Sequence, residues 1–260
     1  MLLSAEHISL NFGLKPLLDD VTLYLSQGDK VGLIGINGTG KSSFLRVLAG
    51  QQPPDQGSVT RDPNVQVCFL PQNPPMEAGA TVLEQVFAGF SPDTRALLDY
   101  EAKAMLTRLG LTDFAQPVGT LSGGQRKRVA LAAVLLHPAD VLILDEPTAG
   151  LDPAGAASIL ANIETYRQAN HATVILVSHS MEDVARLADR LVVVSQGTLP
   201  YVGTPREVFS HGEALESMGL AVPAMNRVFS RVRAMGVDID PAVYTVEQAK
   251  AAILDALRKK

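Results

Sequence analysis

The stretch GINGTGKSS, residues 35–43, decides how this chain is expected to fold. It fits the pattern G-x-x-x-x-G-K-[S/T], in which glycines let the backbone wrap closely round phosphate groups with its N–H groups pointing inward. The lysine neutralises the terminal phosphates, and the hydroxyl that follows it can ligate Mg²⁺. The predicted phosphate-binding residues are Gly35, Asn37, Gly38, Thr39, Gly40, Lys41, Ser42 and Ser43.

The residues on either side of this loop favour phosphate binding over a plain flexible turn. KVGLIG (30–35) is a short apolar run rich in β-formers, and SSFLRVLAG (42–50) has helical spacing that ends in a glycine stop signal. The loop therefore lies between a predicted buried strand and a helix N-terminus. The dipole of that helix adds attraction for anions.

Two acidic residues follow a second apolar run, VLILDEPT (141–148). Open α/β sheets bind their ligands at the carboxyl ends of the strands. Asp145 is therefore a candidate Mg²⁺ ligand, and Glu146 is a candidate for orienting and deprotonating an attacking water. A strand that ends in solvated acids is the ordinary alternative, and the lysine-bearing loop is what favours catalysis.

A further glycine pair lies in LSGGQ (121–125), at the start of a predicted helix. Such a helix N-terminus is a second candidate site for an anion. It would serve the same nucleotide if the helical region folded back over it, or otherwise the nucleotide of another subunit. A serine N-cap without a ligand is the structural alternative.

Predicted strands alternate with predicted helices along much of the chain, which indicates an α/β fold with a mostly parallel, covered sheet. Two runs near the N-terminus, 2–12 and 21–28, alternate as strands of an antiparallel sheet. Residues 81–109 and 123–137 are predicted helices, and 51–64 is rich in turn formers. Short helices joined by Gly and Pro turns are expected near the C-terminus.

The sequence thus predicts a P-loop NTPase core with an antiparallel β subdomain, an α-helical lobe and a small helical appendage. The nucleotide-binding domain is assigned to 1–203, with the helical lobe at about 74–138. The appendage is assigned to 204–260.

Composition narrows the function classes. Of the 260 residues, 47% are hydrophobic, enough for a substantial core, and the formal net charge is −5. A DNA-binding surface would usually be basic, so no specific DNA partner is expected. The single cysteine, Cys68, cannot form an internal disulfide, which suits a cytoplasmic location. No signal peptide is expected, and no apolar run reaches the ~18–20 residues that span a bilayer, so a membrane role would need a partner.

Taken together, these motifs resemble those of ATP-binding cassette (ABC) ATPases, in the family's order and from Met1 to about Gly203. The resemblance implies ATP hydrolysis with Mg²⁺ and the head-to-tail closure of two cassettes around two ATP molecules. A lone monomer is then expected to hydrolyse ATP slowly, because the charge stabilisation supplied by the opposing subunit would be missing.

The resemblance also implies roles for residues that carry no clear signal alone. Phe12 is implied to stack on adenine, and Gln72 to link Mg²⁺ and the γ-phosphate to the helical lobe. Asp152, in AGLD, is implied to lie in the loop that joins the two sites, and His179, in LVSHS, to contact the γ-phosphate. The signature that reaches the opposing ATP is implied to consist of Ser122, Gly123, Gly124 and Gln125.

Each of these residues has a structural alternative. Phe12 could be a core residue, Gln72 a polar residue at a strand end, and His179 a neighbour of a helix cap. The basic run QRKR (125–128) is interpreted as the solvated face of the signature helix.

The two ends of the chain resemble different branches of the family. The N-terminal part, with FLPQNPPM (69–76) and YEAKAMLTRLGLTDF (100–114), is similar to the soluble, ribosome-associated ABC-F proteins. From about Thr148 onward, TAGLDPAG (148–155) and GTPREVFS (203–210) are similar to the ATPase subunits of energy-coupling factor transporters. We interpret the chain as a mosaic, natural or engineered, joined between the signature helix and AGLDP.

The favoured function is the energising ATPase subunit of an energy-coupling factor type importer. It would pair with a second ABC ATPase subunit, identical or different, through the appendage, and would reach the membrane through an integral transporter subunit. A translation-associated ATPase that binds the ribosome and a chimeric scaffold without a native transport partner are the alternatives.

Overall fold

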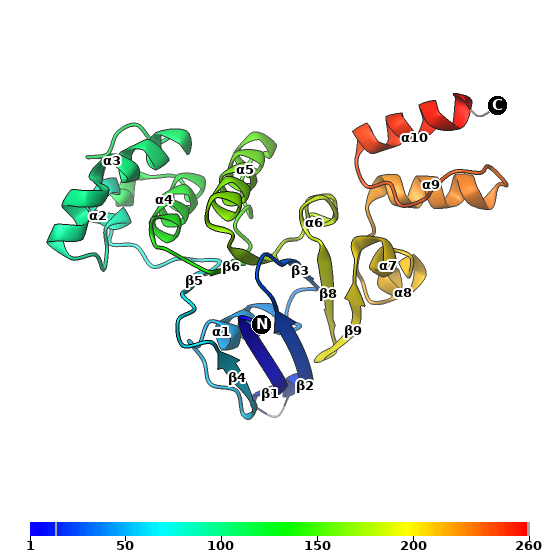
Figure 1. Cartoon of the computed structure of the whole chain (residues 1–260), viewed down its shortest axis with the longest axis horizontal. Helices are drawn as coiled ribbons and strands as arrows, with labels where there is room; N and C mark the ends of the chain where they lie inside the picture. The colour runs from blue at the N-terminus through cyan, green and yellow to red at the C-terminus, as the bar shows by residue number, and fades with distance from the viewer. Residues whose placement is uncertain (14, 259–260) are drawn as a thin grey trace.

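A six-stranded sheet with the order β5-β6-β7-β3-β8-β9 runs through the centre of the molecule (Figure 1). The structure is a computed structural model that describes residues 1–13 and 15–258. All neighbouring strands in this sheet are parallel except β8 and β9. The strands are β3 (Lys30–Ile34), β5 (Val67–Leu70), β6 (Val141–Asp145), β7 (Thr173–Val177), β8 (Arg190–Ser195) and β9 (Thr198–Gly203).

Both faces of this sheet are buried, which explains the near-continuous apolar runs. Successive side chains of a strand point to opposite faces. Val141 and Ile143 of β6 accordingly belong to one core cluster, and Leu142 and Leu144 to the other. The strands β7 and β8 divide their side chains in the same way.

Helices cover the two faces unequally. Helix α1 (Lys41–Leu48) lies on one face, between the six-stranded sheet and a smaller one (Figure 1). Helices α4 (Gly123–Leu136), α5 (Pro153–Asn170) and α6 (Met181–Leu187) lie on the other face. The predicted α/β class with a mostly parallel sheet is therefore confirmed.

The smaller sheet is the predicted antiparallel subdomain, but it contains one strand more than expected. Its order is β2-β1-β4, with β1 at Leu3–Phe12, β2 at Lys15–Leu25 and β4 at Gln56–Arg61. The strand β4 falls in the stretch that the sequence marked as rich in turn formers. Its side chains are mostly exposed, so no apolar alternation marks it, and the backbone pairing with β1 defines it.

The strand β9 was also missed by the sequence analysis. Its residues alternate between exposed and half-buried positions, and it carries Pro200. It pairs only with β8 and closes one edge of the sheet, where a proline is tolerated.

Between β5 and β6 the described chain contains only helices. These are α2 (Val82–Val86), α3 (Pro92–Arg108), the 3₁₀ helix η1 (Val118–Thr120) and α4. A capping box between Thr81 and Glu84 starts α2, and Ser91 caps α3, which begins at a proline. The core of this helical lobe is continuous with the core above the sheet.

Beyond β9 four more helices follow, at the opposite end of the molecule from α2 and α3 (Figure 1). Helices α7 (Pro205–Phe209) and α8 (Gly212–Ser217) pack on the main core, whereas α9 (Ala224–Ala234) and α10 (Val246–Arg258) share a small cluster of their own. Residues 259–260 of the proposed appendage lie outside the described residues.

Gly32 in the middle of β3 lets helix α6 lie close to the sheet. A Cβ atom at this position would lie 2.9 Å from Cδ2 of Leu191 and closer still to Cγ1 of Val184. We expect Gly32→Ala to lower the free energy of unfolding by about 1 to 3 kcal/mol, the usual effect of overpacking a core. Urea unfolding of the variant and the parent measures this difference.

Gly79→Ala is the matched control, because a Cβ atom at Gly79 meets nothing within 4 Å. Equal unfolding midpoints for Gly32→Ala and the parent would show that α6 has room to move away from the sheet.

Candidate nucleotide-binding site

The carboxyl ends of four parallel strands collect the predicted site residues at one edge of the sheet. Gly35 follows β3 directly, Glu146 follows β6, and His179 lies two residues after β7. Gln72 lies two residues after β5. Loops at this edge are where α/β sheets bind ligands, so the topology alone brings together segments that are far apart in sequence.

The loop after β3 has the curvature that phosphate binding requires. Gly38 and Gly40 have φ angles of 82° and 92°, in the left-handed region that glycine tolerates. A Cβ atom at Gly35 would lie 2.9 Å from Oγ1 of Thr39, whose hydroxyl donates to the carbonyl of Ile36 at 2.9 Å. The loop is therefore held in a tight turn that leads into α1.

Lys41, the first residue of α1, folds back over this loop. Its Nζ atom donates to the carbonyl oxygens of Gly35 and Ile36, both at 2.8 Å, and the residue is 5% exposed. Burial lowers the pKa of Lys41, and the nearby carboxylates of Glu146 and Asp145 oppose that shift. The ammonium group of Lys41 is thus a mostly desolvated positive charge beside the carbonyl oxygens of the loop.

Asp145 lies at the end of β6 and is 2% exposed. Its Oδ1 atom is buried with no hydrogen-bond partner among the described residues, while the side chain also bonds to Ser42. Burial raises the pKa of Asp145, and the Ser42 hydrogen bond opposes that shift.

These two side chains fit a Mg²⁺ ion. A carboxylate oxygen without a partner and a neighbouring hydroxyl are hard oxygen donors of the kind that Mg²⁺ prefers. The described residues contain no group of three or more His, Cys, Asp or Glu side chains that could hold a metal. Mg²⁺ usually takes phosphate oxygens and waters as its other ligands, so a larger protein cluster is not required.

The carboxylate of Glu146 contacts side chains from two other loops of the site. Its Oε1 atom lies 2.7 Å from Nε2 of His179, and its Oε2 atom accepts a hydrogen bond from Nε2 of Gln72 at 2.8 Å. Two of the predicted catalytic residues, from two other loops, therefore converge on the carboxylate of the third. The backbone of Glu146 has a φ angle of 49°, which is rare for a residue with a side chain.

Lys127 is a site neighbour that the sequence analysis missed. From the second turn of α4 its Nζ atom donates to the main-chain carbonyl of Glu146 at 3.0 Å. Burial lowers the pKa of Lys127, and the charges of Glu146 and Asp145 oppose that shift. The interpretation of QRKR as a solvated face is wrong for Lys127 and Arg128, which are both half-buried.

The signature residues form a second group, apart from this cluster. Ser122 caps α4 and shares a capping box with Gln125, so the structural alternative for this serine is also realised. Asp152 caps α5 by accepting a hydrogen bond from the N–H of Gly155 at 3.4 Å, without a capping box. A Cβ atom at Gly124 would lie 2.8 Å from Leu151, so the signature and the AGLD loop are neighbours. Within the described chain neither the signature residues nor Asp152 makes a hydrogen bond to the phosphate loop.

Phe12 lies at the tip of the β1–β2 hairpin and is 78% exposed, so the core alternative for this residue is wrong. The same hairpin lies against the phosphate loop, because a Cβ atom at Gly40 would lie 3.0 Å from the carbonyl oxygen of Leu17. An exposed aromatic ring is therefore carried by the strand pair that borders the loop, as a stacking role requires.

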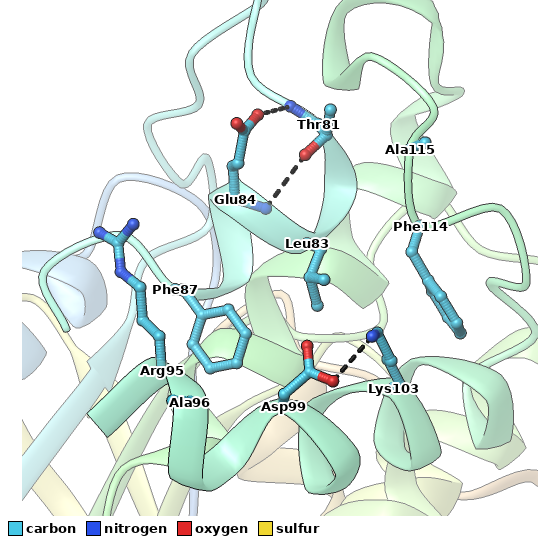
Figure 2. Close-up of a pocket in the computed structure, with 10 residues that line it drawn as sticks. All are labelled: Thr81, Leu83, Glu84, Phe87, Arg95, Ala96, Asp99, Lys103, Phe114 and Ala115. Atoms are coloured by element: carbon cyan, nitrogen blue, oxygen red, sulfur yellow. Dashed lines mark hydrogen bonds and ion pairs between the residues drawn. The ribbon is translucent and has the colours of Figure 1, made fainter. Parts of the chain in front are cut away.

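The helical lobe carries an open groove of about 740 Å³. Figure 2 shows the side chains of Leu83, Phe87 and Phe114 directed into the space between α2, α3 and the segment before η1. An ion pair of 2.7 Å between Asp99 and Lys103 lies on its α3 side. The groove has an apolar floor and a charged rim.

Comparisons with known proteins agree with this geometry. The profile of the family described as ABC transporter matches residues 18–149. The "Energy-coupling factor transporter ATP-binding protein EcfA2" of Caldanaerobacter subterraneus subsp. tengcongensis is 36% identical over 93% of this chain and 91% of its own length. The EcfA2 protein of Symbiobacterium thermophilum is 39% identical over 92% of the chain and 89% of its own length.

A solved structure of a nucleotide-free ATP-binding cassette from an ABC transporter superposes with a TM-score of 0.71. It is 26% identical to this chain, and the alignment covers 83% of this chain and 97% of that one.

The buried carboxylate of Asp145 is expected to lower the free energy of unfolding of the protein without ligands. Because its folded-state pKa is raised, the ionised form is disfavoured by folding at neutral pH, and this penalty disappears as the pH falls through the folded pKa toward the unfolded one. We expect Asp145→Asn to raise the melting temperature without nucleotide or Mg²⁺ at pH 7 to 8. The gain should shrink toward pH 4.

Differential scanning fluorimetry of the two proteins across this pH range measures both effects. A lower melting temperature for Asp145→Asn at neutral pH would mean that the carboxylate stabilises the empty site.

Proposed function

The chain belongs to the ABC transporter family of ATPases, and on that premise we propose that it energises an importer of the energy-coupling factor type. The relatives that carry the EcfA2 name align with 92 to 93% of the chain, which includes most of the appendage. The nucleotide is ATP with Mg²⁺, and the site residues are those that converge at the carboxyl edge of the sheet.

The observation that carries the catalytic part is the placement of Glu146. Its carboxylate is held between Gln72 and His179, beside the desolvated ammonium group of Lys41. In this arrangement Glu146 orients the attacking water and accepts its proton, and His179 and Gln72 fix the carboxylate and approach the γ-phosphate. Ser42 and Asp145 would hold Mg²⁺, which would supply positive charge against the phosphates.

The loop supplies the binding energy for the phosphates. Loop N–H groups and the positive end of α1 attract anions, and Nζ of Lys41 lies against carbonyl oxygens of the same loop. On the ATP-bound enzyme Lys41 exchanges the carbonyls of Gly35 and Ile36 for phosphate oxygens. Phe12 stacks on the adenine ring from the neighbouring hairpin.

A complete site needs a second ATPase subunit. Ser122, Gly124 and Asp152 lie apart from the phosphate loop of their own chain, so we propose that they serve the ATP of the opposing subunit. That subunit is a second copy or a different ATPase of the same family.

The appendage is the proposed site of pairing between the two subunits. Its last two helices, with Met235 just after α9, leave large apolar side chains in contact with solvent, which are Val228, Met235, Val246, Ile253, Leu254 and Leu257. Such a set of exposed apolar residues is typical of an interaction surface.

The membrane component of the importer is proposed to dock in the groove of the helical lobe (Figure 2). Leu83, Phe87 and Phe114 offer an apolar floor for a helix of that component. No helix in the described part of the chain is long and apolar enough to cross a membrane. We therefore place the protein on the cytoplasmic face of the membrane, held there by its partner.

The mosaic interpretation gains no support from the relatives. Two EcfA2 proteins each match more than nine tenths of the chain, with the N-terminal half included. Neither the ribosome-associated alternative nor the chimeric scaffold is retained.

The test of this function is the oligomeric state and turnover of Glu146→Gln. The variant keeps the size and shape of the side chain but lacks the base, so we expect ATP and Mg²⁺ to convert it to a stable dimer. Turnover should fall at least a hundredfold, within the range of losses for general-base removal. Size-exclusion chromatography with light scattering and a phosphate-release assay measure the two effects.

Lys41→Ala in the same background is the control. It removes the charge that faces the terminal phosphates, so its ATP affinity should fall about tenfold or more, and no ATP-dependent dimer should form. Turnover by Glu146→Gln at the parent rate would contradict the assignment of the base.

The groove proposal is tested by Leu83→Glu. A carboxylate on the apolar floor should reduce co-purification with a co-expressed energy-coupling transmembrane component by at least about tenfold, because the interface would bury an unpaired charge. Tyr24→Glu, a change at an exposed position of the antiparallel subdomain, is the control. Equal recovery of Leu83→Glu and the parent would place the docking surface elsewhere.

A further inference from the structure

Three consecutive basic side chains on α4 each donate to a main-chain carbonyl, but to different parts of the molecule. Arg126 and Arg128 donate to carbonyls inside the helical lobe, at 3.1 to 3.2 Å. Lys127, which lies between them, instead crosses to the sheet and donates to the carbonyl of Glu146 at 3.0 Å. The basic run therefore includes one link between the lobe and the catalytic edge.

The acceptor of this link is a strained peptide unit. Glu146 has a φ angle of 49°, and the next residue is Pro147, which restricts the conformation of the residue before it. The Glu146 carbonyl receives two hydrogen bonds, from the N–H of Ala149 at 3.2 Å and from the ammonium group of Lys127. A charged donor is the stronger of the two kinds, so Lys127 does most to hold the strained unit.

The direction of the Glu146 side chain depends on this backbone conformation. Its two carboxylate oxygens meet His179 and Gln72 at 2.7 and 2.8 Å, and both contacts would be lost if the peptide unit relaxed. A strained residue persists only where its surroundings over-determine it, and here those surroundings include Lys127.

We propose that Lys127 is a positioning residue for ATP hydrolysis, which holds the Glu146 backbone so that the carboxylate can orient the attacking water. The proposal rests on the proposed function, in which Glu146 is the base. Lys127 does not touch the nucleotide or the reacting atoms and acts through Glu146.

Lys127 lies on the same helix as the signature residues Ser122–Gln125, fewer than two turns from the helix start. The hydrogen bond that holds the Glu146 carbonyl therefore comes from the helix that carries the signature.

The experiment compares Lys127→Met with the parent chain. Methionine keeps the unbranched stem and removes the donor, so we expect kcat to fall about tenfold to a hundredfold, the effect of losing a hydrogen bond from a charged group. The KM for ATP and the equilibrium affinity for ATP should stay within about twofold of the parent. The reason is that Lys127 makes no contact that binds ATP in the ground state. Lys127→Arg should recover most of kcat.

Arg128→Met is the matched control, because Arg128 donates only within the helical lobe. We expect it to lower the melting temperature while kcat per folded molecule stays near the parent value. Amide hydrogen exchange gives a readout independent of turnover. Exchange over residues 146–151 should be faster in Lys127→Met than in Arg128→Met.

The outcomes separate this proposal from the proposed function. Parent-like kcat and exchange for Lys127→Met, with Glu146→Gln inactive, would overturn the role of Lys127 alone. Equal losses in ATP affinity and kcat would also overturn it, because Lys127 would then act on binding. An inactive parent, or an active Glu146→Gln, would overturn the proposed function and this proposal together.

Discussion

The parallel pairing of β6 with β5 and β7 is the constraint on which the rest of the structure depends. Both faces of β6 are buried, so a slip of one residue would place each side chain in the wrong core. The register that packing enforces aligns the carboxyl ends of the strands. Gln72, Glu146 and His179 meet because of that alignment, although 74 residues separate the first two and 33 the last two.

Two different parts of the chain hold Glu146 in place. Its carboxylate is fixed by two side chains from neighbouring strand ends, and its carbonyl is fixed by a lysine from the helical lobe. The sheet thus determines where the acid lies, and the lobe influences how it is turned.

The parts of the fold and site that the sequence predicts are those marked by local patterns. The phosphate loop, the strand before Asp145 and the helix caps follow from residue types at fixed spacings. Phe12, Gln72 and His179 carry weak local signals, and only the resemblance to a family drew attention to them.

The missed features depend on partners that no local pattern reveals. The strands β4 and β9 have exposed side chains, so the hydrogen bonds of a neighbouring strand define them. Lys127 donates to a backbone carbonyl, a group that every residue possesses, and its identity therefore says nothing of its partner. Short stretches at each end of the chain favour a mosaic, whereas the EcfA2 relatives are similar to 92 to 93% of the chain.

The contact of Lys41 with its own loop has a consequence for ligand selection. The ammonium group already satisfies two of its three donors on carbonyl oxygens, so an anion gains little by approaching it alone. A phosphate oxygen can take the third donor, but an anion that draws the ammonium group fully toward itself breaks both of those bonds. A polyphosphate chain offers the lysine several oxygens and the loop amides several more, and it recovers what it displaces. Lys41 in this sense latches its own loop, and a ligand that draws the ammonium group away must offer enough oxygens to replace the carbonyls of Gly35 and Ile36.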